Sequence, residues 1–290
     1  MRYFNFKASE DLKANTCYHY KIADSIYQSN VKIAELEFLI QTQYFDNNIS
    51  NHVSKEIKNP HQVYSDVAVI GDKQYPLRVM AGFQSDYNLL LKDNNYSITT
   101  ELINSNFLDT DINILLGPAL ILNLALNKVF CMHASVFTIN TTTFILMANS
   151  GTGKSTIARY IHNQSIGKRV GDDIIPLKIK DKGLILLPSF PQLKLSQSQQ
   201  YQGQEIGAKT IFLFAEKTNN NTSLHTIDTF SGMKKLIQHT VATKLFAQAE
   251  LKNHLDLCHK ASQQIKSYLL KYQHSENSLQ QLVDLINELC

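Results

Sequence analysis

The sequence lacks several features that define large classes of proteins, and each absence narrows what the chain can be. No run approaches the ~20 consecutive apolar residues of a membrane-spanning helix. The first residues, MRYFNFKASEDLK, carry acidic side chains where a signal peptide has an uninterrupted apolar stretch. The four cysteines, Cys17, Cys131, Cys258 and Cys290, include no CxxC pair. We therefore expect the thiols to be reduced and the protein to be cytoplasmic. We expect no membrane partner.

Charge is also scarce. Charged residues make up 18% of the 290 positions, and the net charge is only +3. This balance is too small to indicate nucleic-acid binding, and the lysines are scattered rather than gathered in a basic stripe. Apolar residues make up 43%, which is enough for a real core and excludes a fully disordered chain. At ~150 residues per domain, the length allows about two domains.

The pattern changes along the chain near residue 111. Residues 1–110 indicate mostly short strands, and VYSDVAVIGDKQYPLRVMAGFQ predicts a hairpin around Gly71-Asp72-Lys73. After residue 111, LLGPALILNLALNKVF has apolar residues on nearly every face and predicts a buried helix. Two short buried strands, Val136–Ile139 and Thr143–Met147, then flank a polar turn. This alternation predicts an α/β core within residues 111–290.

The last sixty residues predict a helical tail. MKKLIQHTVATKLFAQAEL and NHLDLCHKASQQIKSYLLKY have apolar residues three and four positions apart. Ser278-Leu279-Gln280-Gln281 has the pattern of a capping box that opens a last helix. His254 and Cys258 are four residues apart, a spacing that suits a metal, but two further ligands are not apparent, so we expect no zinc site.

The most specific feature is the stretch ANSGTGKS, Ala148–Ser155. It has the Walker A spacing with alanine at the first glycine, after an apolar strand and before the helix-like TIARYIHNQ. An accidental glycine-rich turn would match this pattern in only ~2% of chains of this length. We expect the following residues to bind a nucleotide: Asn149, Ser150, Gly151, Thr152, Gly153, Lys154, Ser155 and Thr156.

Each residue type in this loop has a chemical reason. Gly151 and Gly153 allow the backbone to curl, so that successive N–H groups converge on phosphate oxygens. The positive end of the following helix lies at the same place. Lys154 would bridge the β- and γ-phosphates, and the Ser155 hydroxyl would bind Mg²⁺. Alanine at position 148 costs little if its φ is negative.

An acidic pair and a histidine flank this loop. Gly171-Asp172-Asp173 follows Lys168-Arg169-Val170, which we interpret as the next parallel strand, so the carboxylates would face the ligand crevice. In isolation the tripeptide would be an ordinary turn. His133 precedes the strand that leads into the loop, and alone it would be a structural histidine. Lys168 and Arg169 fit a phosphate contact and a solvated strand end equally well.

The ordered trio of His133, the phosphate loop and Asp172-Asp173 resembles HPr kinase/phosphorylase and its relatives. The resemblance covers roughly Gly117–Leu177. It implies a core similar to that of phosphoenolpyruvate carboxykinase, with ATP and Mg²⁺ as ligands. It also implies that Asp172 is the general base on a serine hydroxyl, that Asp173 supports Mg²⁺ with Ser155, and that His133 orients Asp172, with Lys154 on the phosphates.

Within this family, one group looks closer to the chain. Its pattern is a Leu-Gly-Pro helix, His-Ala-Ser, the loop, Asp-Asp and Pro-x-Leu-x-Leu, here Pro191–Leu195. These are HPr-kinase-like proteins encoded with ribosomally made peptides, including lasso-peptide tailoring kinases. The resemblance implies a serine kinase acting on a peptide or small protein, with residues 1–110 recognising the substrate. Two alternative functions stay open: an HPr-type regulatory kinase and a nucleotide-binding module without phosphoryl transfer. The identity of the phosphoryl donor and the formation of a homo-oligomer stay open as well.

Overall fold

A computed structural model of the chain divides into two compact units. One contains Met1–Asn127 and Ala242–Ala247, and the other contains Lys128–Val241 and Gln248–Cys290. The assignment of residues 1–110 to substrate recognition stays a prediction. The structure describes residues 2–6, 16–23, 25–29, 40–45, 62–64, 67–70, 77–81, 87–91, 97–100, 116–117, 120–180, 183–187, 190–191, 209–246, 248–273 and 275–290.

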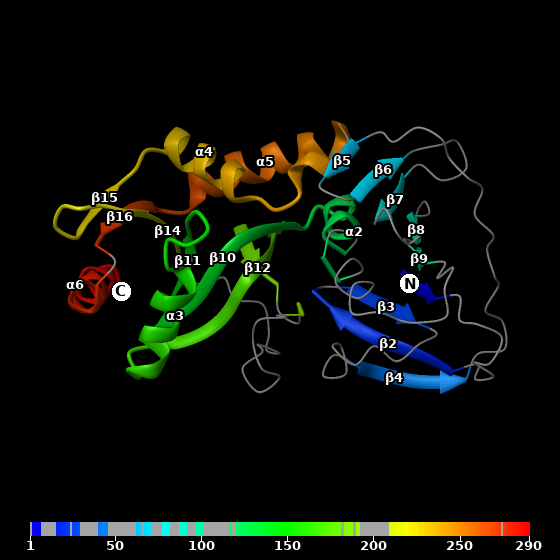
Figure 1. Cartoon of the computed structure of the whole chain (residues 1–290), viewed down its shortest axis with the longest axis horizontal. Helices are drawn as coiled ribbons and strands as arrows, with labels where there is room; N and C mark the ends of the chain where they lie inside the picture. Colours follow the sequence, from blue (N-terminus) through cyan, green and yellow to red (C-terminus); the bar gives the residue numbers. More distant parts are fainter. Residues whose placement is uncertain are drawn as a thin grey trace. The chain divides into compact units, whose positions relative to one another are not determined.

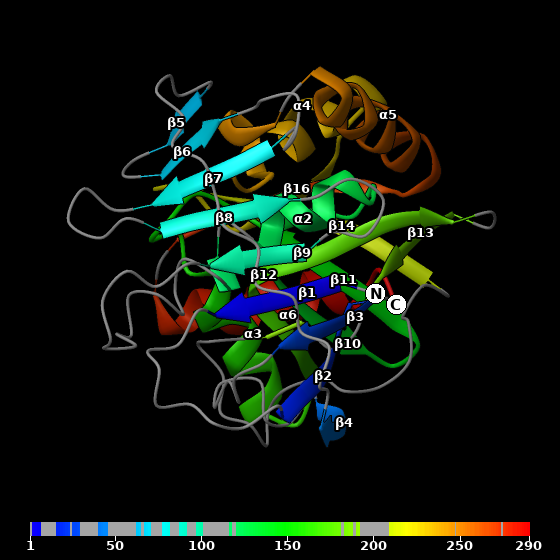
Figure 2. The same cartoon turned by 90° about the vertical axis from the view of Figure 1, so that its right-hand side faces the viewer.

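The first unit contains a nine-stranded sheet in the order β4-β2-β3-β1-β9-β8-β7-β6-β5, which runs from bottom to top in Figure 2. Strand β1 is parallel to β3 and β9, and the other neighbours are antiparallel. The two strands of the expected hairpin pair antiparallel, with Val69 of β6 opposite Val79 of β7, and its expected turn at Gly71-Asp72-Lys73 lies outside the described residues. The strands are β1 (Arg2–Phe6), β2 (Thr16–Ile22), β3 (Ser25–Ser29), β4 (Ile40–Phe45), β5 (Gln62–Tyr64), β6 (Val67–Ile70), β7 (Leu77–Ala81), β8 (Tyr87–Leu91) and β9 (Ser97–Thr100).

The first unit also contains helix α2 (Leu120–Leu126) and the 3₁₀ turn η4 (Thr243–Leu245). Helix α2 buries its first six residues, Leu120–Ala125, so the expectation of an apolar helix without an exposed face is confirmed.

The second unit has a seven-stranded sheet in the order β13-β12-β10-β11-β14-β16-β15. Strands β11, β14 and β16 are mutually parallel, and the outer pairs are antiparallel. The strands are β10 (Phe130–Ile139), β11 (Thr142–Met147), β12 (Lys168–Lys180), β13 (Gly183–Leu186), β14 (Lys209–Lys217), β15 (Ser223–Thr226) and β16 (Ser267–Tyr272). The chain is thus a mixed α/β protein.

Helices cover both faces of this sheet. Helices α3 (Lys154–Asn163) and α6 (Glu276–Asn287) lie on one face, and α4 (Thr229–His239) and α5 (Gln248–Gln264) lie on the other (Figure 1). Strand alternation explains this, because Ile211, Leu213 and Ala215 of β14 pack against α3 and α6. Phe214 points the other way and stacks on His239 at the end of α4. The apolar runs of β11 and β14 are continuous because these strands are buried on both faces.

The prediction of a helical tail is only partly correct. Ser267–Tyr272, SYLLKY, forms the strand β16 between β14 and β15, and the helical stretch around residues 233–251 is interrupted between α4 and α5. In SYLLKY, Tyr268, Leu270 and Tyr272 alternate, whereas the added Leu269 makes the run equally compatible with a helix. Pairing with two neighbouring strands decides the outcome. The last capping box also starts earlier, because Ser275 is the N-cap and its N–H donates to Ser278 Oγ at 3.2 Å.

The acidic pair also lies differently from the expectation. Strand β12 does not end at Gly171-Asp172-Asp173 but continues to Lys180, and it pairs antiparallel with β10 and β13. Strand β12 runs in the same direction as β11, but β10 lies between them. The carboxylates therefore lie in the middle of a strand, facing its neighbour β10, rather than at a strand end.

Candidate functional site

The phosphate loop has the backbone that its glycines predict. Strand β11 ends at Met147, and helix α3 begins at Lys154. Gly151 and Gly153 have φ values of 75° and 108°, which favour glycine because a Cβ would strain the backbone there. Ala148 has no positive φ, so the condition for alanine at this position is met. The strand–loop–helix context required for phosphate binding is therefore present.

The end of helix α3 that faces the loop is suited to an anion. Its N-cap, Gly153, provides no side-chain cap, so no side chain of this residue competes for the N–H groups of the first turn. The Lys154 ammonium donates to the carbonyl of Ala148 at 2.7 Å and lies 3.4 Å from that of Asn149. Lys154 is only 7% exposed, so its ammonium group faces the loop rather than the solvent.

The loop is held from behind by a neighbouring strand. The hydroxyl of Tyr272, at the end of β16, donates to the carbonyl of Thr152. Tyr272 is 1% exposed, and burial raises its pKa to about 12, so the phenol keeps its proton for this hydrogen bond. Strand β16 therefore fixes the position of the loop between its two glycines.

Asp172 is buried and accepts three hydrogen bonds. Its Oδ1 accepts from Ser135 Oγ and, at 3.0 Å, from Ser155 Oγ, and its Oδ2 accepts from Arg169 Nη2. Ser135 lies directly opposite Asp172 in the β10–β12 register, so both side chains point the same way. Only 2% of the Asp172 side chain is exposed. The expected metal ligand Ser155 thus lies beside the first carboxylate of the pair.

Asp173 is paired with His133 and is much more accessible. Asp173 Oδ1 lies 3.4 Å from His133 Nε2, and their side chains are 29% and 37% exposed. Neighbouring side chains on a regular strand point to opposite faces. Asp173 instead has a φ of 75°, which interrupts this alternation. Both carboxylates can therefore meet His133 and Ser135, which share one face of β10.

A second histidine lies near the loop. His239 stacks on Phe214, with ring centroids 6.2 Å apart, and Phe214 lies opposite Met147, the residue that precedes the loop. Burial, together with the nearby charges of Lys154, Lys235 and His133, lowers the pKa of His239 to about 4. The imidazole of His239 is therefore neutral at pH 7.

The structure brings most of the expected site residues together. The loop, Ser155, Asp172, Asp173 and His133 all gather around the carboxyl end of β11 and the middle of β12. Thr156 is exposed on the first turn of α3. One expected contact differs. The resemblance implies that His133 orients Asp172, whereas in the structure His133 lies against Asp173.

Several residues of the site were not assigned a role from the sequence. They are Ser135, Arg169, His239 and Tyr272, which lie on β10, β12, α4 and β16. The sequence does not decide between a phosphate contact and a solvated strand end for Arg169, and in the structure its side chain is 9% exposed and lies against Asp172. The His-Ala-Ser spacing was the one available signal for Ser135, since residues i and i+2 of a strand share a face. Tyr272 reaches the loop only through tertiary packing.

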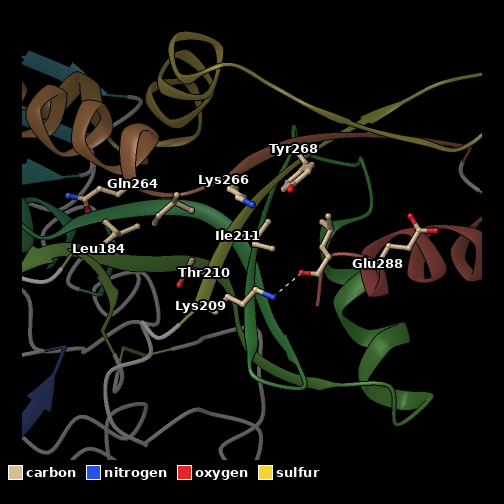
Figure 3. Close-up of a pocket in the computed structure, with 11 residues that line it drawn as sticks. Leu184, Lys209, Thr210, Ile211, Gln264, Lys266, Tyr268 and Glu288 are labelled. Atoms are coloured by element: carbon tan, nitrogen blue, oxygen red, sulfur yellow. Dashed lines mark hydrogen bonds between the residues drawn. The ribbon is translucent and has the colours of Figure 1, made fainter.

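A separate pocket of about 740 Å³ lies elsewhere in this unit, near the amino-terminal ends of β14 and β16 (Figure 3). Its walls include Lys209, Lys266, Tyr268 and Glu288, and Lys209 donates to the carbonyl of Leu289 at 3.2 Å. None of the site residues expected from the sequence lines it. The phosphate loop follows the opposite, carboxyl end of β11.

The His254 and Cys258 pair is a buried polar cluster. His254 Nε2 lies 2.7 Å from Thr240 Oγ1 and 3.2 Å from Cys258 Sγ. Burial lowers the pKa of His254 to about 4 and raises that of Cys258 to about 12, so both groups are neutral at pH 7. Within the described ranges, no group of three or more His, Cys, Asp or Glu side chains is arranged to hold a metal ion.

Comparisons with known proteins give little further information. No protein-family model matches the chain, and no curated protein matches it. Among solved structures, the chain is similar to the HPr(Ser) kinase/phosphatase from Coxiella burnetii. The identity is 13%, the TM-score is 0.31, and the match covers 55% of this chain and 88% of that one. We take no residue role from so distant a similarity.

In the part of the chain that the structure describes, no helix combines the length and apolar character needed to cross a membrane.

Proposed function

We propose that the chain is a Mg²⁺-dependent kinase that transfers the γ-phosphoryl group of ATP to a serine hydroxyl of a peptide or small protein. One arrangement carries the proposal. A phosphate loop lies beside a buried carboxylate, Asp172, which contacts the Walker A serine. The next residue on the same strand is the accessible Asp173, which pairs with His133 of the neighbouring strand β10. These are the parts that phosphoryl transfer needs: a phosphate cradle, oxygen ligands for a metal and a base.

The loop side of the site fits ATP and Mg²⁺. The Ser155 hydroxyl and the Asp172 carboxylate are hard oxygen donors only 3.0 Å apart, and Mg²⁺ prefers one or two such ligands together with phosphate oxygens. Ser155 and Asp172 would hold the ion, and Lys154 would contact the phosphates. When bound, Mg²⁺ neutralises the charge that develops on the transferred group.

The accessible carboxylate fits the role of general base. A serine hydroxyl is too weakly acidic to attack as a free alkoxide, so a carboxylate must accept its proton. Asp173 is 29% exposed and can meet an acceptor, whereas Asp172 is 2% exposed and already accepts three hydrogen bonds. We therefore exchange the two roles that the resemblance implied. The serine oxygen bonds to the γ-phosphorus, its proton passes to Asp173, and ADP leaves.

The acceptor belongs to the proposal as well. The sequence pattern that continues to Pro191–Leu195 resembles kinases encoded with ribosomally made peptides, so we propose a precursor peptide, of the lasso-peptide type, as substrate. The core around the loop contains only phosphate chemistry. Residues 1–110 are therefore our proposed recognition region.

Labelled ATP, Mg²⁺ and candidate peptides, incubated with matched variants, test the proposal. Asp173→Asn should lower phosphopeptide formation by about 10²–10⁴-fold while retaining Mg²⁺-dependent binding of a fluorescent ATP analogue. Asp172→Asn should lose that metal dependence. Asp256→Asn, exposed on α5, is the control and should match the unmodified chain.

Two outcomes would contradict the proposal in different ways. In the first, Asp173→Asn transfers phosphate fully, whereas Asp172→Asn loses transfer but keeps normal metal-dependent nucleotide binding. This result would show that Asp172, and not Asp173, is the general base. ATP hydrolysis without phosphopeptide from any serine-containing candidate would favour a nucleotide-binding signalling module.

A further inference from the structure

Arg169 is a largely buried cation whose position depends on an irregularity in strand β12. Residues three apart on a regular strand point to opposite faces. Here the β10–β12 register shifts, because Val136 is opposite Gly171 whereas Phe137 is opposite Arg169. Val170 is therefore the extra residue of a β-bulge, and the bulge places Arg169 on the same side as Asp172. The bulge thus brings together a charge pair that β-sheet alternation would separate.

The pair is almost fully removed from water. The side chains of Arg169 and Asp172 are 9% and 2% exposed, and Nη2 of Arg169 donates to Oδ2 of Asp172. A buried carboxylate without a counter-charge is strongly destabilising. Arg169 therefore provides much of what holds the Asp172 carboxylate in place inside the protein.

The two oxygens of Asp172 face different partners. Oδ1 meets the hydroxyls of Ser135 and Ser155, on the side of the phosphate loop, whereas Oδ2 meets Arg169. Within the described part of the chain, Nε of Arg169 is buried without a hydrogen-bond partner. A buried unsatisfied N–H costs free energy, so the arginine is not in its best possible hydrogen-bonding arrangement.

We propose that Arg169 is a positioning residue that acts as the counter-charge of Asp172 until Mg²⁺ binds, and that Arg169 and Mg²⁺ compete to neutralise this carboxylate. The inference rests on the proposed metal role of Asp172. Arg169 keeps the carboxylate oriented in the metal-free protein, and it raises the Mg²⁺ concentration that the site requires. The site then binds a metal only when a nucleotide arrives with it.

The stability of the full chain with and without Mg²⁺ tests this competition. Arg169→Met keeps the length of the side chain but removes its charge. We expect a clear fall in Tm without metal, and recovery of most of that fall when Mg²⁺ alone is added, because the ion replaces the lost charge. Lys168→Met changes the exposed neighbour on the same strand and should leave Tm unchanged in both conditions. A merely structural arginine would give the same fall with and without Mg²⁺.

Nucleotide binding provides the second measurement. The Mg²⁺ concentration that half-saturates binding of a fluorescent ATP analogue should fall about tenfold in Arg169→Met, as expected when one nearby positive charge is lost. Arg169→Lys, which keeps the charge, should restore a requirement close to that of the unmodified chain. An unchanged Mg²⁺ requirement in Arg169→Met would overturn the inference.

A double variant and a single variant separate the possible failures. If Arg169→Met does not fold, Arg169→Met/Asp172→Asn, which removes both charges, should fold and show no effect of Mg²⁺ on Tm. A double variant whose Tm still rises with Mg²⁺ would contradict the inference. If Asp172→Asn alone leaves metal-dependent binding unchanged, the proposed metal role of Asp172 fails. If Asp172→Asn abolishes it while Arg169→Met behaves like Lys168→Met, only the inference fails.

Discussion

Two carboxylates next to each other in the sequence have opposite environments in this site. Asp172 is buried among three donors, whereas Asp173 is accessible and lies against His133. The positive φ of Asp173 and the bulge at Val170 separate their surroundings within a single strand. Such local strain persists only where the surrounding structure holds it, and it is common at functional sites. One buried and one exposed carboxylate suit a metal ligand and a base.

Tyr272 provides a test of the loop at the same scale. Tyr272→Phe removes the hydroxyl that donates to the Thr152 carbonyl. We expect a loss of about 1–3 kcal/mol in the free energy of unfolding, because a carbonyl loses its buried partner. Nucleotide binding should weaken as well, since the loop is less firmly held.

Urea unfolding and titration with a fluorescent ATP analogue measure the two effects. Tyr268→Phe is the matched control, because Tyr268 lies on the same strand but lines the separate pocket instead of contacting the loop. Equal stability and equal nucleotide affinity in Tyr272→Phe and Tyr268→Phe would show that the hydroxyl does not support the loop.

At the scale of elements, the sequence predicted local features well and pairings poorly. The Walker A spacing predicted strand β11, the glycine-bearing loop and helix α3, because each depends on residues close in sequence. The course of β12 could not be predicted, since Gly171-Asp172-Asp173 is compatible with a turn and with a bulged strand. The same holds for β16, whose Leu269-Leu270 pair fits both periodicities. Pairing partners, distant in sequence, decided both cases.

The turn between α3 and β12 yields a prediction at this scale. A Cβ on Gly167 would lie 2.2 Å from the carbonyl oxygen of Thr138 and 3.0 Å from side-chain carbons of Ile139 and Ile161. Since backbone cannot yield as a flexible side chain does, Gly167→Ala should force β12 away from β10. We expect a loss of about 3 kcal/mol.

The free energy of unfolding in urea checks this expectation. Gly117→Ala serves as the control, because nothing lies within 4 Å of the position of its Cβ, and it should change stability by no more than about 0.5 kcal/mol. If Gly167→Ala is as stable as Gly117→Ala, the close approach of β10 to this turn does not hold in solution.

At the scale of the whole molecule, the chain passes between its two units more than once. Ala242–Ala247 belongs to the unit of residues 1–127, although the segments on both sides belong to the unit with the phosphate loop. Just before this segment, the N–H of Val241 donates to the carbonyl of Cys131 at 2.8 Å, and Thr240 forms a bridge with Met132. The end of α4 is thereby attached to the strand that carries His133. The division of the chain into a recognition region, residues 1–110, and a catalytic domain, residues 111–290, stays a prediction.

The buried histidines make the stability of the molecule depend on pH. Burial lowers the pKa of His254 from 6.5 to about 4, so the folded state resists a proton that the unfolded chain accepts. The contribution to stability is therefore complete above pH 6.5 and is lost as the pH falls toward about 4. The difference corresponds to about 3 kcal/mol. His239, whose pKa is lowered in the same direction, adds to the loss.

Urea unfolding followed by circular dichroism between pH 7 and pH 5 tests this, a range that lies above the titration of ordinary carboxylates. The free energy of unfolding should fall steadily with pH in the unmodified chain. His254→Gln, which retains an acceptor for Thr240, should be less stable at pH 7 but should show a flatter dependence on pH. His225→Gln, exposed on β15, should keep the original slope. Equal slopes in His254→Gln and His225→Gln would mean that the cluster of Thr240, His254 and Cys258 takes up a proton without unfolding.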